Sequence, residues 1–317
     1  MTSMVRRGSF IWLVLHDLRL NWRRFLGMFG GASPAVAVGL MVAGALALHA
    51  VAWPMLPYLA DHLSGAEPSP EGRLALGAFL ICVASWMAAQ GLFQATRTLY
   101  DRGDLDLLLG SPLSPRKVLG AKAVAIALSS LGSVAMLALP VANVGALRYG
   151  AHWLAFYPNL GSLALAATAL ALLVTIALFY VLGPRKARTY AQLGGALLGG
   201  SFVLGVQVIA LLPEGLRTSL TQMLSPARDG ADGVIGHVLW LPVRALQAQP
   251  IDMALLAVIA VVLFATAIWT LGDRFAGACL GAAGSPSADR RAGSRRVVCP
   301  DHALPVRRAQ RVASAAA

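Results

Sequence analysis

Charged side chains are scarce in this sequence. Only 13% of its 317 residues are Asp, Glu, Lys or Arg, whereas 57% are hydrophobic. Water-soluble domains carry charge on about a quarter of their residues, so the composition excludes an ordinary soluble globular protein. Cysteine is also rare: three are present, and the metal-like pair Cys299 and His302 supplies two ligands, which do not make a site.

The motifs of common catalytic sites are missing as well. The sequence has no G-x-x-x-x-G-K-[ST] loop to hold nucleotide phosphates, no H-E-x-x-H and no G-x-S-x-G. We therefore expect that the chain is not an enzyme, that it holds no metal or cofactor, and that it does not hydrolyse ATP by itself.

Long apolar runs are what the sequence has in abundance. Six windows of 20 to 25 residues contain no Asp, Glu, Lys or Arg, and a helix of about 20 residues crosses a ~30 Å hydrocarbon core. A backbone in lipid must satisfy its own hydrogen bonds, which favours helices. We predict an all-α, polytopic membrane protein with six transmembrane helices near 34–53, 74–96, 118–144, 160–182, 189–213 and 253–272.

Basic residues are distributed unevenly between the two ends of these helices. Five Lys and Arg precede the first helix, five lie in 97–122, three in 183–188 and eight after the last helix, against five on the opposite side. Cytoplasmic loops of membrane proteins are enriched in Lys and Arg. We therefore expect both termini in the cytoplasm of a cell whose inner membrane holds the protein. The net charge of +12 is thus a topology signal, and nucleic acid is not an expected partner.

The N-terminal segment, 1–33, is predicted to form an amphipathic helix on the cytoplasmic membrane surface. Ile11, Leu15, Leu18, Trp22 and Phe25 recur at helical spacing, and basic residues border this stripe. A basic helix that carries Trp suits the interface between lipid and water.

Three serines mark where helices should begin. Ser9 precedes the amphipathic helix, while Ser33-Pro34 and Ser114-Pro115 place an N-cap residue before proline, which is favoured at the first helical position. The transmembrane domain is expected over 34–280. The remaining 281–317 is rich in Ala, Arg, Ser and Pro and is predicted to be a disordered, basic cytoplasmic tail.

The loop that follows the second predicted span, 97–122, is unusually structured. Asp104 can cap a short helix that carries Leu105, Leu108 and Leu109 on one face. Gly110 can end that helix, and Pro112 prevents its continuation. A short, sharply bounded helix is therefore expected at the cytoplasmic face.

This combination resembles permease subunits of type-2 ABC exporters. In that family the loop commonly reads Glu, Gly, Thr, Leu, Leu and Pro ahead of a basic residue. Asp104 stands at the Thr-like position, and the comparable places are taken by Asp101, Gly103, Leu105, Leu108, Leu109, Pro112 and Lys122. The resemblance implies that the loop is a coupling helix docked in a groove of a separate ATP-binding subunit, with Asp104 and Asp106 setting its orientation. It also implies two short re-entrant helices in the outer segment 214–250, for which an interfacial loop is the alternative.

Inside the predicted spans, ionisable residues are nearly absent. His49 qualifies, near the outer end of the first span; Gln90, Asn143, Gln192 and Gln207 are polar but do not titrate. Such residues form interhelical hydrogen bonds or line a substrate path. Gly195 and Gly199, four apart in the fifth predicted span, favour close helix packing, either within the subunit or across a dimer.

A transporter without an ionisable relay needs energy from elsewhere. We therefore expect a permease subunit that works as a homo- or heterodimer with two copies of a separate ATPase. The rival interpretation is a membrane scaffold or assembly subunit that moves nothing. An ion-driven carrier is disfavoured by the spans' lack of ionisable residues.

Overall fold

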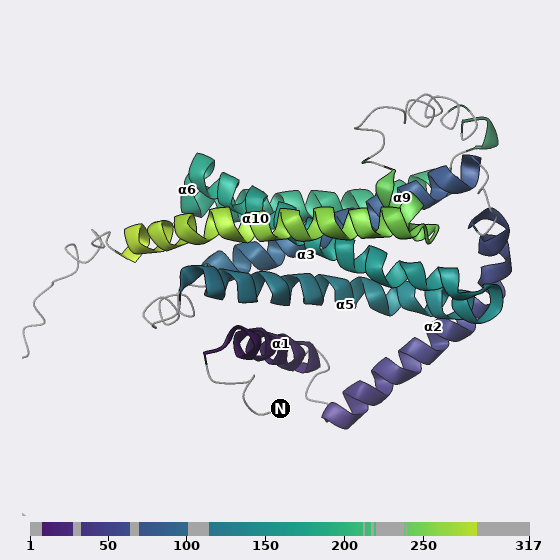
Figure 1. The fold of residues 1–317 in the computed structure, drawn as a ribbon, viewed down its shortest axis with the longest axis horizontal. Helices are drawn as coiled ribbons and strands as arrows, with labels where there is room; N and C mark the ends of the chain where they lie inside the picture. The colour runs from purple at the N-terminus through teal and green to yellow at the C-terminus, as the bar shows by residue number, and fades with distance from the viewer. Residues whose placement is uncertain are drawn as a thin grey trace, which may run out of the picture. The chain divides into compact units, whose positions relative to one another are not determined.

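The computed structural model describes residues 8–27, 33–63, 70–100, 114–211, 213–216, 219, 238 and 240–283. Every regular element among these residues is helical. In chain order they are α1 (Phe10–Gly27), α2 (Pro34–Leu63), α3 (Pro70–Tyr100), α5 (Pro115–Tyr149), the 3₁₀ helix η1 (Ala151–Ala155), α6 (Phe156–Leu211), α9 (Leu241–Leu246) and α10 (Pro250–Ala283), drawn in Figure 1. The all-α class is confirmed for the described residues.

Five of these segments are long and apolar enough to cross a membrane. They are Pro34–Pro57, Ala75–Arg97, Pro115–Tyr149, Ala151–Leu182 and Pro250–Gly272. Each overlaps one predicted span, so the chain is a multi-span helical membrane protein in contact with the lipid bilayer. The sixth predicted span, 189–213, is not among the five candidate segments and stays a prediction.

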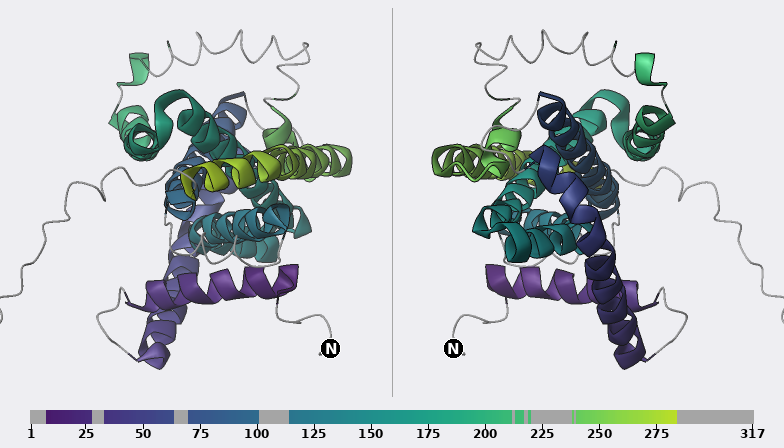
Figure 2. Two further views of the ribbon diagram at one scale, coloured as in Figure 1. Left: turned by 90° about the vertical axis from the view of Figure 1, so that its left-hand side faces the viewer. Right: turned by 90° about the vertical axis from the view of Figure 1, so that its right-hand side faces the viewer.

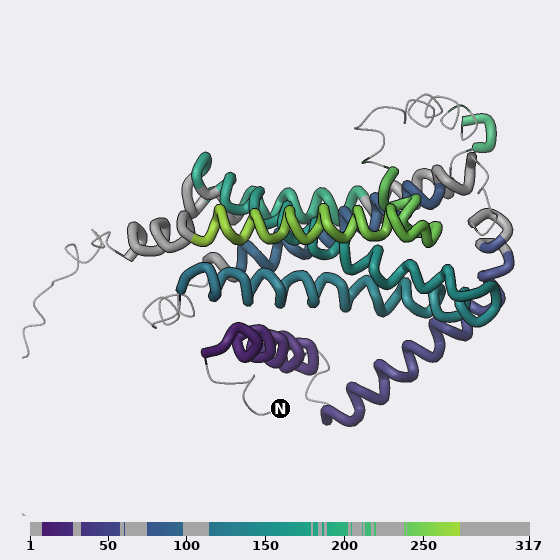
Figure 3. The backbone as a smooth tube through the Cα atoms, in the orientation of Figure 1, coloured from purple at the N-terminus to yellow at the C-terminus, as the bar shows by residue number. Residues whose placement is uncertain are grey.

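The residues of that sixth span lie in the second limb of α6, which folds back on the first. Ala171 and Ala191 pack in one cluster with Leu92 of α3, although 20 residues of straight helix would separate them by about 30 Å. Farther along the second limb, Gly195 and Gly199 lie beside Ala89. The limb therefore runs back toward the start of α3, a course that can be followed in Figure 3.

The three helix starts that the serines predicted are confirmed, and two of the three serines cap their helix through the side chain. Ser9 Oγ accepts a hydrogen bond from the amide of Trp12 at 3.2 Å, and Ser33 Oγ accepts one from Val36 at 3.3 Å. Ser114 is the N-cap residue of α5, with Pro115 at the first helical position, but its side chain makes no capping hydrogen bond; its backbone carbonyl accepts from the amide of Lys117 at 2.9 Å.

Two apolar clusters hold the helices of unit 1–277 together. The larger one packs the first half of α3 against α2, α5, η1 and α6, with Met87 and Leu160 at its centre. In the second cluster, Leu119 near the start of α5 packs with Leu172 in the first limb of α6 and with Phe264 of α10. The chain's second compact unit, 278–317, is described only over 278–283, the last residues of α10. The predicted tail lies beyond that range, outside the described residues.

The N-terminal helix lies across α5 (Figure 2). Leu13 and Val14 are buried against Ala121 of α5, a contact that the sequence pattern did not indicate. Ile11, Leu15 and Trp22 of the predicted apolar stripe remain 45%, 37% and 41% exposed. Helix α1 therefore uses one face for α5 and leaves an apolar stripe uncovered, as a helix on a membrane surface would.

Candidate functional site

A cavity of about 690 Å³ opens between four helices: α1, α3, α5 and the second limb of α6. Each helix contributes one stripe of residues three or four apart, which is the spacing of one helical face. On α3 this stripe is Trp86, Ala89, Gln90, Phe93, Gln94 and Arg97. The volume is within the range of small-molecule sites, roughly 300–1,000 Å³.

One end of the cavity is basic. Arg24 of α1, Arg97 of α3 and Lys122 of α5 line it, together with a single carboxylate, Asp17. Lys122 Nζ lies 3.7 Å from Asp17 Oδ2, and both side chains are largely covered, 13% and 20% exposed. This ion pair ties α1 to α5 and directs the polar side of α1 into the cavity rather than into solvent.

Amide and hydroxyl side chains join two walls of the cavity. Gln94 Nε2 donates to Ser129 Oγ at 3.3 Å, and Ser133 Oγ donates to Gln90 Oε1 at 3.1 Å. The two bonds are one helical turn apart on antiparallel α3 and α5, so they fix the register between these helices. Interhelical bonds of this kind contribute roughly 0.6–2 kcal/mol each in membranes. For Gln90, the expected interhelical hydrogen bond is confirmed; the side chain also lines the cavity, and its role in a substrate path stays a prediction.

Small residues form the wall contributed by α6. Gly195 and Gly199 line the cavity with Gln192 and Ala196. A Cβ added at Gly195 would lie 3.4 Å from the carbonyl oxygen of Ala89, so the small residues allow the second limb to approach α3 closely. This contact lies within one chain.

The predicted coupling residues all fall outside the described part of the chain. Asp101, Gly103, Asp104, Leu105, Asp106, Leu108, Leu109 and Pro112 belong to 101–113, between the end of α3 and the start of α5. What the structure does give is the placement of the loop's two ends. Both are continuous with helices that line the cavity.

A second group of polar residues joins α2, α5 and α6 at the other end of the bundle. Asn143 Nδ2 lies 3.2 Å from His49 Nε2, and Tyr157 donates from its hydroxyl to Asn143 Oδ1 at 2.5 Å. His49 Nδ1 lies 2.7 Å from the carbonyl oxygen of Ala45; since a carbonyl can only accept, Nδ1 carries the proton and Nε2 accepts from Asn143. His49 therefore forms an interhelical hydrogen bond between α2 and α5.

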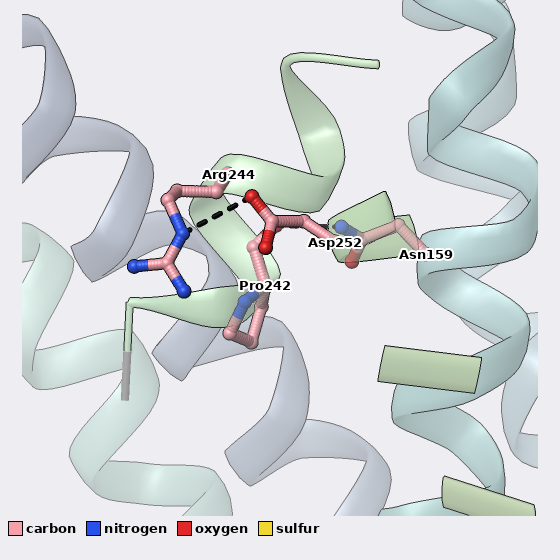
Figure 4. A network of polar contacts seen from close by, with 4 residues as sticks. All are labelled: Asn159, Pro242, Arg244 and Asp252. Atoms are coloured by element: carbon pink, nitrogen blue, oxygen red, sulfur yellow. Dashed lines mark hydrogen bonds and ion pairs between the residues drawn. The ribbon is translucent and has the colours of Figure 1, made fainter. Parts of the chain in front are cut away.

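Short helix α9 is held at this same end by polar contacts (Figure 4). Asn159 Nδ2 donates to the carbonyl of Pro242 at 2.7 Å, and Arg244 Nε donates to Asp252 Oδ2 at 3.1 Å. Leu241 and Ala245 of α9 are buried and pack with Leu256 of α10. Helix α9 lies in the outer segment 214–250, where two short helices were expected; of residues 214–239 in that segment, only 214–216, 219 and 238 are described.

No group of three or more His, Cys, Asp or Glu side chains that could hold a metal ion occurs among the described residues. The cavity itself was not predicted from the sequence. The signal that could have found it was the stripe of Trp86, Gln90, Phe93, Gln94 and Arg97, which places polar and aromatic side chains on one face of an otherwise apolar helix.

Fold and site define the class: a multi-span helical membrane protein with an open cavity between its helices that is basic at one end. Comparison with known proteins takes the identification no further, because no protein-family model, curated protein or solved structure matches the sequence.

Proposed function

We propose that the chain is the transmembrane permease subunit of an ABC exporter, working as a dimer with a separate ATP-binding subunit. The observation that carries the proposal is the connection between loop and cavity. Segment 101–113 joins the end of α3 to the start of α5, and these two helices supply the residues Arg97 and Lys122 at the basic end of the cavity. A partner that moves the loop would therefore move two walls of the cavity directly, because the loop is joined to both helices.

The energy source follows from the spans. The described residues that line the cavity include no acidic side chain on α3, α5 or α6, and His49 is engaged with Asn143 and Ala45 away from it. Proton-driven carriers place chains of Asp, Glu or His along their transport path, whereas Asp17 of α1 is the single such residue among the described residues that line the cavity, and it is paired with Lys122. An external motor, an ATPase that docks on Leu105, Leu108 and Leu109, fits this arrangement better.

Orientation in the membrane is part of the same proposal. The loop 101–113 lies at the end of the helices where basic residues concentrate, which by the positive-inside rule is the cytoplasm. An ATPase that uses cytoplasmic ATP could reach the loop there. With six spans, including the second limb of α6, both termini would lie on this side.

The test is to measure how much ATPase co-purifies with the chain from its native membrane. Leu105→Asp with Leu108→Asp should reduce recovery of the ATPase about a hundredfold or more, because burying each leucine contributes roughly 1.5–3 kcal/mol. Two exposed residues near the opposite end provide the matched control: Leu216→Asp with Val238→Asp should leave recovery unchanged.

Both variants must insert and express like the wild type, which membrane fractionation checks. Equal recovery of an ATPase with the loop variant and the wild type would contradict coupling through this loop. Absence of any ATPase with wild-type protein would favour the rival function, a membrane scaffold.

A further inference from the structure

The cavity is polarised along its length. Arg97 lies at one end of the α3 stripe and Trp86 at the other, eleven residues or about 16 Å apart. The register of Gln94 with Ser129 and Gln90 with Ser133 places Lys122 within about one turn of Arg97 on the adjacent helix. Arg97 and Lys122 are therefore gathered at one end of the cavity, the end at which α1 crosses α5 near Ala121.

Charge at that end is unbalanced in favour of cations. Three basic side chains, Arg24, Arg97 and Lys122, face one carboxylate, Asp17, among the lining residues. Arg24 and Arg97 are exposed in the described structure. An anion at this end would be attracted by the two exposed guanidinium groups, and also by Lys122 while that side chain keeps Asp17 as its partner.

Away from the basic end, the walls suit hydrocarbon. Phe93 is 51% exposed and Trp86 37% exposed, and both line the cavity. Opposite them, Ala196 and Gly199 of α6 carry almost no side chain, so they leave space along the aromatic rings. Apolar surface of this kind is expensive to leave in water and is commonly covered by an apolar ligand group.

We propose that this cavity binds an acidic lipid, with its anionic headgroup at Arg24, Arg97 and Lys122 and the first part of an acyl chain along Trp86 and Phe93. A soluble anion would use only the basic end, and a zwitterionic lipid would bring no net charge to it. The proposal deepens the proposed function, because it names the class of substrate that the permease would move. The binding itself requires no ATPase.

The experiment uses the purified full chain in an uncharged maltoside detergent. A phosphatidylglycerol and a phosphatidylcholine that carry the same fluorescent acyl chain are titrated separately, and binding is followed by fluorescence anisotropy. Phosphatidylglycerol should bind about fivefold or more tightly, and its affinity should fall as salt is raised, because the preference is electrostatic. Glycerol phosphate, the headgroup alone, should compete poorly.

Two matched pairs of variants locate the site. Arg24→Gln should weaken phosphatidylglycerol binding roughly threefold to fivefold, as expected for one exposed charge, whereas Arg23→Gln, the adjacent residue outside the cavity lining, should not. Ala196→Trp fills the apolar part and should weaken binding about tenfold or more. Leu197→Trp, 65% exposed and outside the lining, should leave it unchanged.

Equal affinity for the two lipids would overturn the proposal, and so would equal effects of the variants within either pair. Full competition by glycerol phosphate at lipid-like concentrations would show a site for soluble anions and would overturn it too. Because the assay contains no ATPase, its result is independent of the co-purification test. Lipid binding without a co-purifying ATPase would reject the permease and keep the lipid site.

Discussion

Gly145 must be glycine because the ring of Trp153 occupies the space where its side chain would stand. Trp153 is buried at 4% exposure and stacks on Phe156, with ring centroids 5.8 Å apart. The ring thus seats η1 and the start of α6 on the end of α5. A single hydrogen atom at residue 145 determines how closely three elements meet.

Gly145→Ala should lower the stability of the protein in detergent. Overpacking of a close contact costs roughly 1–3 kcal/mol, more than the 0.5–1 kcal/mol that Ala gains over Gly in a helix. Gly132→Ala on the same helix is the control: a Cβ there meets nothing within 4 Å, so stability should stay level or rise slightly. Thermal unfolding followed by tryptophan fluorescence measures both. A Gly145→Ala protein as stable as the control would contradict the placement of Trp153.

Which polar residues matter could be predicted from the sequence only in part. Gln90, Asn143 and Gln192 stand out against an apolar background and are conspicuous in the sequence. Their partners could not be foreseen, because hydropathy does not say which helices adjoin. Gln90 meets Ser133 on α5, while Asn143 meets His49 on α2. The cavity arises from four helix faces together, and the polar and aromatic stripe of α3 is the one that is conspicuous in the sequence.

At the scale of elements, local chemistry predicted the helix starts well. Ser9, Ser33-Pro34 and Ser114-Pro115 each precede a helix in the structure, since capping depends on neighbours in sequence. Helix ends were predicted less well. The first span was expected to end at 53, but α2 continues through Pro54 and Pro57 to Leu63. A proline removes one hydrogen bond of the helix, and packing of Leu56 and Ala60 in the main core compensates for it.

Helix α6 folds back on itself, although its hydrogen-bonded helix has no break. The helix is continuous over 56 residues, while Gly183-Pro184 in the sequence is a common cause of sharp kinks. Contacts decide the matter, because Ala171, Ala191 and Leu92 pack together. Six spans require that the two limbs of α6 run antiparallel, because each limb would then cross the membrane once.

Cross-linking tests this fold-back. With Cys82, Cys279 and Cys299 replaced by Ala, a variant with Ala171→Cys and Ala191→Cys should be joined within one chain by a short bifunctional thiol reagent. The control moves the second cysteine to Leu197, which is 65% exposed, and should give little product. Mass spectrometry of the digested monomer identifies the link. If the 171–191 pair reacts no better than its control, the limbs do not lie side by side.

At the scale of the whole molecule, the proposed function requires that ATP hydrolysis come from another protein. The chain has no phosphate-binding loop, so the purified protein should hydrolyse ATP no faster than an empty-detergent control. Release of phosphate measured with and without Mg²⁺ provides the comparison. Turnover by the chain alone that survives further purification would contradict both its proposed place as a permease and the expectation that it is not an enzyme.

The proposed permease function depends on the protein's orientation in the membrane, with the cavity's basic end and the loop 101–113 in the cytoplasm. Single cysteines at the two ends of α5 test this directly. In the cysteine-free background, Ser114→Cys precedes the helix, and His152→Cys follows it; both positions are exposed. Intact cells are treated with a membrane-impermeant maleimide, and permeabilised cells show that each cysteine can react.

The account predicts that the cysteine at 152 is labelled in intact cells and the cysteine at 114 only after permeabilisation. Labelling at 114 but not at 152 in intact cells would contradict it, because the loop would then face away from any ATPase supplied with cytoplasmic ATP.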